Sequence, residues 1–290
     1  MHQRLTAPQS ARRAGTAFVL GGGGLLGAAE VGMLGALLEF GVQPDIIVGT
    51  SIGALNGAAI AADPSVTGVE HLSELWREVT VSGAFAGSVL QRVGTLARSR
   101  THLQSNAALR RLLEQHHGDR RIEDLPVRFE CVAASIERAE EHWFTDGPLV
   151  EALLASAAVP GILPAVRIGD EHFIDGGIVN SIPVSRAVQL NAARIFVCHV
   201  GRVDRRLRAP RQPIEVGLVA FEIARRHRFH TDMAALPDDI EVHVLPTGDG
   251  DGPSYESLAD FRHRDLSRLE RRVQAAHAAS RRYLSRVKPL

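Results

Sequence analysis

The sequence predicts an α/β protein with a mostly parallel central sheet that is covered by helices on both faces. Two strand–turn–helix units follow one another at the start of the chain, and the later apolar segments alternate mostly between strand and helix patterns. This alternation is typical of parallel sheets, because each helix carries the chain back to the start of the next strand. The length of 290 residues suits one domain with a single large core.

The two opening units each place a turn between a strand and a helix. The first has an apolar run at 17–20 that ends in four glycines, Gly21 to Gly24. Apolar residues then recur at helical spacing, at Ala28, Val31, Leu34, Leu37 and Leu38. The second has a short apolar strand at 46–48, which runs through Ser51 into a helix of small residues, IGALNGAAIAA.

The rest of the chain is assigned from the same periodicities. Strands are predicted at 128–135, 142–144, 172–174, 194–200 and 240–245. Helices are predicted at 69–79, 105–118, 148–158, 182–190 and 255–284, the last of them amphipathic with Leu258, Phe261, Leu269 and Val273 inward. Residues 81–103 have weaker periodicity and suit a lid over a site, and 202–213 form an arginine-rich loop.

Charge and cysteine content exclude several classes of protein. Basic and acidic side chains number 33 each, so no net field attracts nucleic acid. Cys131 and Cys198 lie in apolar runs, which indicates two buried, reduced thiols. The N-terminus lacks the apolar segment of a secretory signal, and glycines and Glu30 interrupt the most apolar stretch. We therefore expect a cytoplasmic protein whose contact with a membrane, if any, is peripheral.

The strongest local signal is a serine between a strand and a helix, in Gly49-Thr50-Ser51-Ile52-Gly53. A serine on such a sharp turn has its hydroxyl exposed, and the flanking glycines permit close packing of the backbone. The helix that begins at Ile52 adds partial positive charge, which favours a developing anion. Ser51 is therefore the candidate nucleophile, and the alternative is an ordinary helix N-cap.

The glycine run at the end of the first strand is the second signal. Gly22, Gly23 and Gly24, with Gly27, leave backbone N–H groups free to converge on a negatively charged oxygen, as an oxyanion hole requires. The same glycines also satisfy the dinucleotide-binding pattern G-x-G-x-x-G. That site needs an acidic residue at the end of the second strand, where this chain has Ser51. A P-loop needs a lysine, which the run lacks.

The third signal is an aspartate that leaves an apolar strand and enters a glycine turn, Asp175-Gly176-Gly177. A carboxylate in that position is held rigidly, partly desolvated, and can be aimed at a hydroxyl. These are the properties of a base that is paired directly with a serine. The alternative for Asp175 is a structural role in an Asp-Gly turn.

The three motifs together resemble the patatin-like phospholipase family, which has a glycine-rich loop, a G-x-S-x-G turn and a D-G-[AG] motif in this order. The stretch from Ser156 to Pro164 resembles the S-x-x-x-P-x-x-x-P segment of the family. The resemblance runs from about Thr16 to about Val200. One departure is Leu26, where family members commonly have Arg or Lys, and this change leaves the rate and the preference for substrate charge open.

The resemblance implies a three-layer patatin-like fold, with 1–15 as a tail, 16–200 as the catalytic domain and 201–290 as the C-terminal part of the same domain. It implies a lipid acyl hydrolase of the phospholipase A, lysophospholipase or esterase type, with a lipid or acyl ester as substrate. Asp175 would accept the proton of Ser51, an acyl-enzyme would form, and water would release the fatty acid. No metal or cofactor is implied.

Several alternatives stay open at this point. A Ser-His-Asp hydrolase would use His199 or His243, which come late enough in the chain. A degenerate domain would bind lipid or a partner without catalysis, and Leu26 is the only hint of it. His227 and His230 can share a helix face and bind a metal, but no third ligand stands at clear spacing. A dinucleotide-binding protein ranks last. Helix 148–158 either walls an acyl channel or, as we favour, belongs mostly to the core.

Overall fold

A computed structural model of the chain describes residues 13–82, 99, 101–200, 206–210, 213–248 and 266–287. Most of the predicted tail and of the predicted lid at 81–103 lies outside these residues. So do parts of the arginine-rich loop at 202–213 and the first part of the predicted C-terminal helix, which includes Leu258 and Phe261. The predicted domain boundaries stay a prediction.

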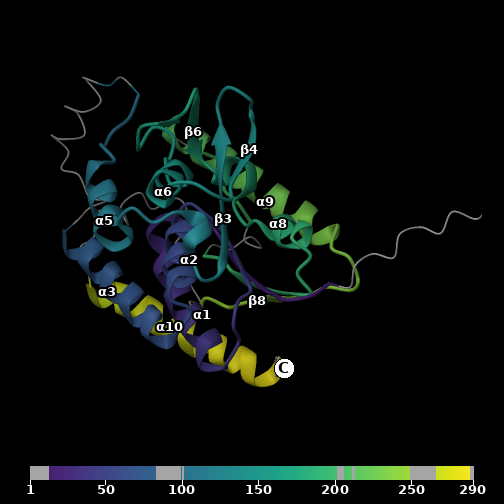
Figure 1. The fold of residues 1–290 in the computed structure, drawn as a ribbon. Coiled ribbons are helices and arrows are strands. Elements are labelled where there is room, and N and C mark those ends of the chain that lie inside the picture. The colour runs from purple at the N-terminus through teal and green to yellow at the C-terminus, as the bar shows by residue number, and fades with distance from the viewer. Residues whose placement is uncertain are drawn as a thin grey trace, which may run out of the picture.

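The core of the fold is one eight-stranded mixed sheet (Figure 1). Its strands are β1 (Thr16–Leu20), β2 (Ile46–Thr50), β3 (Arg128–Ser135), β4 (Glu140–Phe144), β5 (Val166–Ile168), β6 (Glu171–Asp175), β7 (Arg194–Cys198) and β8 (Glu241–Val244). The strand order is β5-β6-β3-β2-β1-β7-β8, with β4 paired to β3 off this path. The run from β3 through β2, β1 and β7 to β8 is parallel, whereas β4, β5 and β6 pair antiparallel. The predicted mostly parallel α/β sheet is therefore confirmed.

Helices cover both faces of this sheet. They are α1 (Ala28–Glu39), α2 (Ile52–Ala62), α3 (Val66–Ser82), α5 (Ala107–His117), α6 (Leu149–Ser156), α7 (Gly177–Asn180), α8 (Val184–Gln189), α9 (Pro213–Ala234) and α10 (Leu266–Val287), with short 3-10 turns at Gly24–Gly27 and Ile122–Asp124. Figure 1 shows α1, α2, α3 and α10 on one side of the sheet and α8 and α9 on the other. No helix in the described part of the chain combines the length and the apolar character needed to cross a bilayer.

Two apolar cores, one on each face, follow from the alternation of side chains along the strands. In β1, Phe18 and Leu20 belong to the larger core beneath α1, α2 and α6. Ala17 and Val19 of the same strand belong to the smaller core beneath α8 and α9. Both faces of a parallel strand are buried in such a layered fold, which explains the nearly continuous apolar runs in the sequence.

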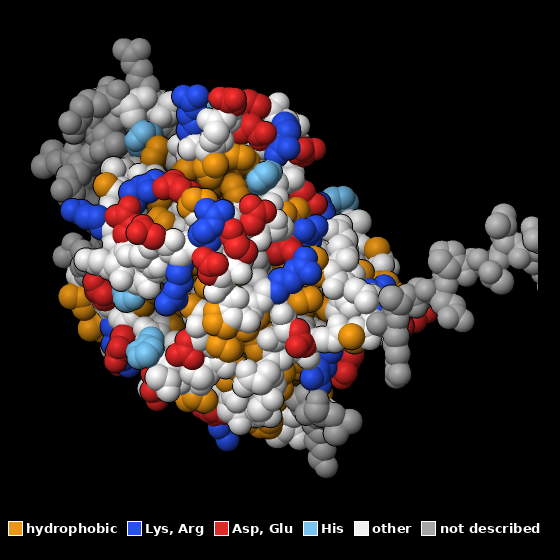
Figure 2. Space-filling model, in the orientation of Figure 1, with side chains coloured by type: hydrophobic (Ala, Val, Ile, Leu, Met, Phe, Trp, Pro, Cys, Tyr) orange, Lys and Arg blue, Asp and Glu red, His pale blue; other side chains and the backbone are white. Residues whose placement is uncertain are grey.

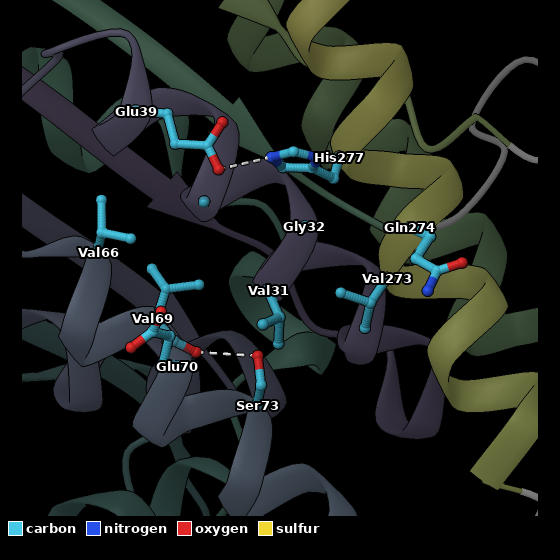
Figure 3. A pocket seen from close by; sticks show the side chains of 11 residues that line it. Val31, Gly32, Glu39, Val66, Val69, Glu70, Ser73, Val273, Gln274 and His277 are labelled. Atoms are coloured by element: carbon cyan, nitrogen blue, oxygen red, sulfur yellow. Dashed lines mark hydrogen bonds and ion pairs between the residues drawn. The ribbon is translucent and has the colours of Figure 1, made fainter.

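Helix α10 packs along α1 because α1 has a glycine at the crossing point. A Cβ on Gly32 would lie 2.1 Å from the carbonyl oxygen of Val273 in α10. Beside this crossing, a cavity of about 250 Å³ lies between α1, α3 and α10, and Glu39 bonds to His277 at its edge (Figure 3). None of the residues that line this cavity was predicted as a site residue.

Three of the strands and α-helices were not predicted from the sequence, the strand β5, the short helix α7 and the helix α9. The strand β5 has only three residues, too few for a period to emerge. The helix α9 alternates arginine, histidine and apolar residues with only a weak apolar stripe. The C-terminal helix extends to Val287, beyond the predicted end at 284. Figure 2 shows charged side chains of both signs mixed over one face of the molecule.

Candidate active site

Ser51 lies on a strained turn between β2 and α2. Its backbone has φ 55° and ψ −123°, a conformation that residues with a side chain rarely adopt. The flanking glycines permit the turn: a Cβ on Gly49 would lie 2.6 Å from the Cα of Ala54, and one on Gly53 would lie 2.4 Å from the carbonyl oxygen of Leu20. The helix that follows is Ile52–Ala62, the same eleven residues that the sequence predicts.

The register of the sheet brings Asp175 to the same place. Thr50 of β2 pairs with Val132 of β3, and Asp175 of β6 pairs with Ala133, the next residue of β3. Strand β4 occupies the opposite edge of β3 over these residues. The ends of β2 and β6 therefore meet head to head along one edge of β3. As a result, residues 124 positions apart in the sequence become neighbours.

Ser51 and Asp175 are joined by a short hydrogen bond. The Ser51 hydroxyl donates to Oδ2 of Asp175 at 2.5 Å, and the Gly177 amide donates to Oδ1 at 2.7 Å. The two residues are 7% and 3% exposed. Burial raises the pKa of Asp175 from 3.8 to about 6, and the hydrogen bonds from Ser51 and Gly177 oppose the rise. A carboxylate with this pKa is ionised at neutral pH and can still accept a proton.

Ser156, the last residue of α6, contacts both the turn at Ser51 and the segment that follows Asp175. Its hydroxyl accepts a hydrogen bond from the Ser51 amide at 2.9 Å and donates to the Val132 carbonyl at 2.7 Å. Its own carbonyl accepts from the amide of Gly176 at 3.3 Å. One buried serine therefore contacts the turn at Ser51, the strand β3 and the residue after Asp175.

The glycine loop lies directly against Ser51. A Cβ on Gly22 would lie 3.5 Å from the Cβ of Ser51, although the Gly22 amide itself donates to the Ser181 carbonyl at 2.8 Å. Gly22 therefore allows the loop to lie against Ser51. Its N–H group is not a candidate oxyanion donor, because it already donates to Ser181. The amides of Gly23 and Gly24 remain as candidate donors, together with the Ile52 amide at the start of α2. Gly27 closes the 3-10 turn, and its carbonyl accepts from the Asn56 side chain.

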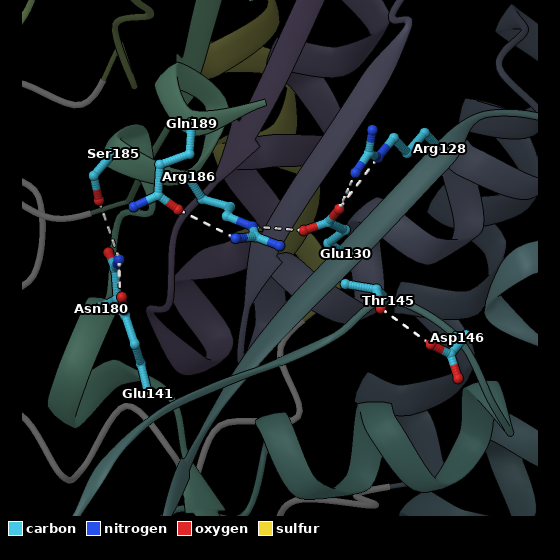
Figure 4. Close-up of polar contacts among 9 residues, drawn as sticks. All are labelled: Arg128, Glu130, Glu141, Thr145, Asp146, Asn180, Ser185, Arg186 and Gln189. Atoms are coloured by element: carbon cyan, nitrogen blue, oxygen red, sulfur yellow. Dashed lines mark hydrogen bonds and ion pairs between the residues drawn. The ribbon is translucent and has the colours of Figure 1, made fainter. Parts of the chain in front are cut away.

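A second set of contacts fixes the segment that follows Asp175. The Thr50 hydroxyl donates to the Asn180 carbonyl at 2.8 Å, which ties the end of β2 to α7. The Asn180 amide group donates to Glu141 and to Ser185 (Figure 4). Figure 4 also shows the buried Glu130 of β3, which accepts from Arg128 and from Arg186 and so anchors α8 to the sheet.

The sequence profile described as Patatin-like phospholipase matches residues 18–188, which is more than half of the chain. The chain belongs to the patatin-like phospholipase family. The matched region contains the glycine loop, Ser51, Ser156 and Asp175, so every contact of the Ser51–Asp175 pair described above lies within it.

The chain spans only a small part of the length of the curated relatives that it matches. The chain is 35% identical over 196 residues to the patatin-like phospholipase domain-containing protein ZK370.4 of Caenorhabditis elegans. This alignment covers 64% of this chain and 14% of that protein. It is 31% identical over 186 residues to the lysophospholipase nte1 of Aspergillus terreus, covering 64% and 12%. Among solved structures, VipD from Legionella pneumophila aligns with a TM-score of 0.48 at 14% identity, covering 94% of this chain and 67% of that one.

The histidines predicted as alternatives, His199 and His243, have other partners. The imidazole of His243 bonds to the Tyr283 hydroxyl and to Glu241, and its ring stacks on Phe196. His199 follows β7 and lies beside the ring of Phe229. No histidine of the described residues hydrogen bonds to Ser51 or Asp175. The geometry therefore favours a pair over a triad.

Other predicted residues take structural places. His227 and His230 are both exposed on α9, and the described residues contain no group of three or more His, Cys, Asp or Glu placed to hold a metal ion. Cys131 and Cys198 are buried and free, and burial raises the pKa of both thiols. Leu26 is half-buried and packs against the larger core. Leu149, Val150, Leu153 and Leu154 of α6 are core residues.

Sequence reasoning missed three polar residues that hold the site together. Ser156 was noted only within a longer motif, and Asn56 and Glu30 were not considered as a pair. The Asn56 side chain donates to Gly27 and to Glu30 and accepts from Trp76, so it joins α2, the glycine loop and α3. A lone polar residue within an apolar helix, as in IGALNGAAIAA, was the available signal.

Proposed function

We propose that this protein is a lipid acyl ester hydrolase that uses Ser51 as nucleophile and Asp175 as general base. The hydrogen bond of 2.5 Å between the two buried side chains is the observation that carries the proposal. Membership of the patatin-like phospholipase family supports a lipid substrate. The cytoplasmic location and the peripheral membrane contact stay predictions.

The chemistry runs in two steps. Asp175 takes the hydroxyl proton as Ser51 Oγ attacks the ester carbonyl, and the negative charge of the tetrahedral intermediate falls on the carbonyl oxygen. The amides of Gly23, Gly24 and Ile52 stabilise that oxygen, helped by the positive end of α2. Asp175 then passes its proton to the leaving alcohol. In the second step Asp175 deprotonates a water as its oxygen attacks the acyl carbonyl. The bond between the acyl carbon and Ser51 Oγ then breaks, Asp175 returns the proton to Oγ, and the fatty acid is released.

The test combines covalent labelling with hydrolysis of an ester panel. A fluorophosphonate should label the wild-type protein at Ser51 and should not label Ser51→Ala. The panel contains a phospholipid, a lysophospholipid, a neutral glyceride and an acyl thioester, because the head group is not fixed by the chemistry. Ser73→Ala, on α3, serves as the matched control and should retain wild-type labelling and rates.

Two results would count against the proposal. If the folded wild-type protein resists labelling, the chain is a binding domain and not an enzyme. If only water-soluble short esters are cleaved, the reaction class stands and the lipid substrate is wrong.

A further inference from the structure

A phenylalanine of α9 lies against the turn that carries the proposed base. A Cβ on Gly177 would lie 2.8 Å from Cζ of Phe221 and 3.0 Å from Oδ1 of Asp175. The ring edge and the carboxylate oxygen therefore border the same small space. The glycine leaves room for both, and its amide donates to Oδ1 at 2.7 Å. Any change of the ring at position 221 is therefore felt at the Asp175 carboxylate.

Other contacts hold α9 in this place. The Arg228 guanidinium donates to the Val179 carbonyl of α7 at 3.4 Å. The ring of Phe229 lies beside that of His199 at the end of β7, with the centroids 5.8 Å apart. Residues 221, 228 and 229 share one face of the helix, because side chains three and four positions apart stack along it. This face fixes the position of Phe221 over the turn.

Phe221 is the part of the cover that α9 supplies. The Asp175 amide donates to the Ala158 carbonyl at 2.9 Å, and a Cβ on Gly176 would lie 2.2 Å from the Val132 carbonyl oxygen. Those contacts belong to the segment after α6 and to β3. Phe221 is half-buried, so water has access to its outer side. A smaller side chain at 221 therefore admits water to the turn and leaves the other contacts in place.

We propose that Phe221 is a positioning residue for proton transfer: its ring shields the Asp175 carboxylate from water and keeps the Gly177 amide against Oδ1. The inference rests on the proposed function, because it concerns the surroundings of the same base. It extends the active site to α9, Pro213–Ala234, which lies outside the matched residues 18–188. A shielded carboxylate is the stronger base, since water stabilises less of its charge.

Charged neighbours do not account for the basicity of Asp175. Burial is the largest cause and raises the pKa of Asp175 to about 6, and the hydrogen bonds from Ser51 and Gly177 lower it. None of the titratable side chains on the packed elements is among the causes. They are Cys131 of β3, Glu140 and His142 of β4, Glu171 of β6, Glu151 of α6, Glu222, Arg225 and Arg228 of α9, and His199 after β7. Shielding from water is therefore the property to test.

The experiment compares the acid limb of the pH–rate profile between the wild type, Phe221→Ala and Phe221→Leu. Phe221→Ala should move the midpoint of kcat/KM down by about one pH unit, because water stabilises the charged carboxylate. At pH 5 this variant should keep about half of its plateau rate, whereas the wild type keeps about a tenth. On the plateau its kcat should fall about threefold with little change in KM, since the base is weaker. Phe221→Leu keeps an apolar cover and should restore the midpoint.

The matched control is Ile223→Ala, which shortens a side chain on the exposed side of the same helix. Ile223 is 55% exposed, and its removal should leave the profile unchanged. A second readout does not depend on activity. NMR of protein labelled with carbon-13 aspartate follows the carboxyl groups from pH 4 to 8, and the signal that is lost in Asp175→Asn identifies Asp175. Its midpoint should show the same downward shift in Phe221→Ala.

The two readouts separate the possible failures. If neither midpoint moves in folded Phe221→Ala, the shielding role is overturned, and the proposed function stands when Ser51→Ala abolishes hydrolysis. If the NMR midpoint moves while the kinetic limb does not, Phe221 shields Asp175, but the assignment of the base to Asp175 fails. Should Phe221→Ala not fold, Phe221→Val decides the question. A smaller downward shift supports the shielding, and an unchanged or raised midpoint overturns it.

Discussion

Two carboxylic acids of this molecule are equally buried, but they face different partners. Asp175, at the end of β6, is 3% exposed and accepts hydrogen bonds from Ser51 and Gly177. Glu30, in the first turn of α1, is 0% exposed and accepts one from Asn56, while its other oxygen has no hydrogen-bond partner among the described residues. Burial raises the pKa of Asp175 to about 6 and raises the pKa of Glu30 well above 4.5.

Burial alone does not make a carboxylate a base. Two donors keep the pKa of Asp175 low enough for the carboxylate to be ionised at neutral pH, and one of those donors is a hydroxyl on a strained turn. The Asn56 side chain and the Gly21 backbone also lower the pKa of Glu30, but burial outweighs both, and no hydroxyl of the described residues hydrogen bonds to it. We therefore propose proton transfer for Asp175 and a structural role for Glu30, whose raised pKa favours the neutral acid beneath the glycine loop.

The largest expected effect separates these two acids directly. Asp175→Asn should lower kcat/KM for a lipid ester by about 10³-fold, because the general base is lost while the shape is kept. Glu30→Gln should stay within a few-fold of the wild type, since the amide resembles a protonated acid. Steady-state hydrolysis of one ester by both variants is the measurement.

Unfolding by urea shows whether the loss in Asp175→Asn is chemical. Removing a buried carboxylate whose pKa is raised should stabilise the fold at pH 8 by up to about 3 kcal/mol. An inactive Asp175→Asn that is also less stable than the wild type would mean that the residue is structural. The assignment of the base to Asp175 would then be wrong.

The second prediction concerns the pH dependence of the reaction. The base must be ionised to accept a proton, so kcat/KM should be flat above the pKa of Asp175 and fall about tenfold per pH unit below about 6. A pH–rate profile between pH 4 and 9 tests this. Glu30→Gln should give the same profile, whereas loss of the acid limb in that variant would transfer the role of base to Glu30.

The sequence predicted the fold class and most elements of the sheet because their signals are local. The strand at 128–135 and the helix at 52–62 have the predicted bounds, since each is an apolar run that ends in polar or turn residues. The antiparallel approach of β6 to β3 was not predicted. It depends on pairing between distant segments, and no local pattern encodes that register.

The candidate site was predictable where a motif fixes a backbone shape. Ser51 and Asp175 each stand in a strand–turn pattern, so both could be named, and the structure brings them together. The contacts of Ser156 and Asn56 could not be derived, because a serine at a helix end or an asparagine in a small-residue helix has many possible partners. Only the folded structure shows that Ser156 contacts Ser51 and that Asn56 contacts Glu30.

The third prediction tests whether the position of Asp175 relative to Ser51 depends on Ser156. Ser156→Ala removes the acceptor of the Ser51 amide and the donor to Val132. We expect kcat to fall about tenfold with little change in KM, because the turn is displaced while the binding surface is kept. Ser280→Ala, a buried serine of α10 whose hydroxyl donates to Pro246, is the control. Equal kcat in both variants would limit Ser156 to a structural role.

The smallest expected effect is on stability and belongs to Glu30. An acid with a raised pKa keeps its proton in the folded state at pH values where the unfolded chain has lost it, so stability falls as pH rises through that window. Asp175 contributes this slope only up to about pH 6. Buried His117 gives a slope of opposite sign up to about pH 6.5, and the buried thiols of Cys131 and Cys198 add to the slope above about pH 8. Between about pH 7 and 8, the remaining slope, at most about 1.4 kcal/mol per pH unit, is therefore expected to belong to Glu30. Urea unfolding at pH 7 to 8 should show the slope in the wild type and Asp175→Asn, and a flatter line in Glu30→Gln. Parallel lines for all three proteins would mean that Glu30 is ionised in the folded state, and the contrast between the two acids would disappear.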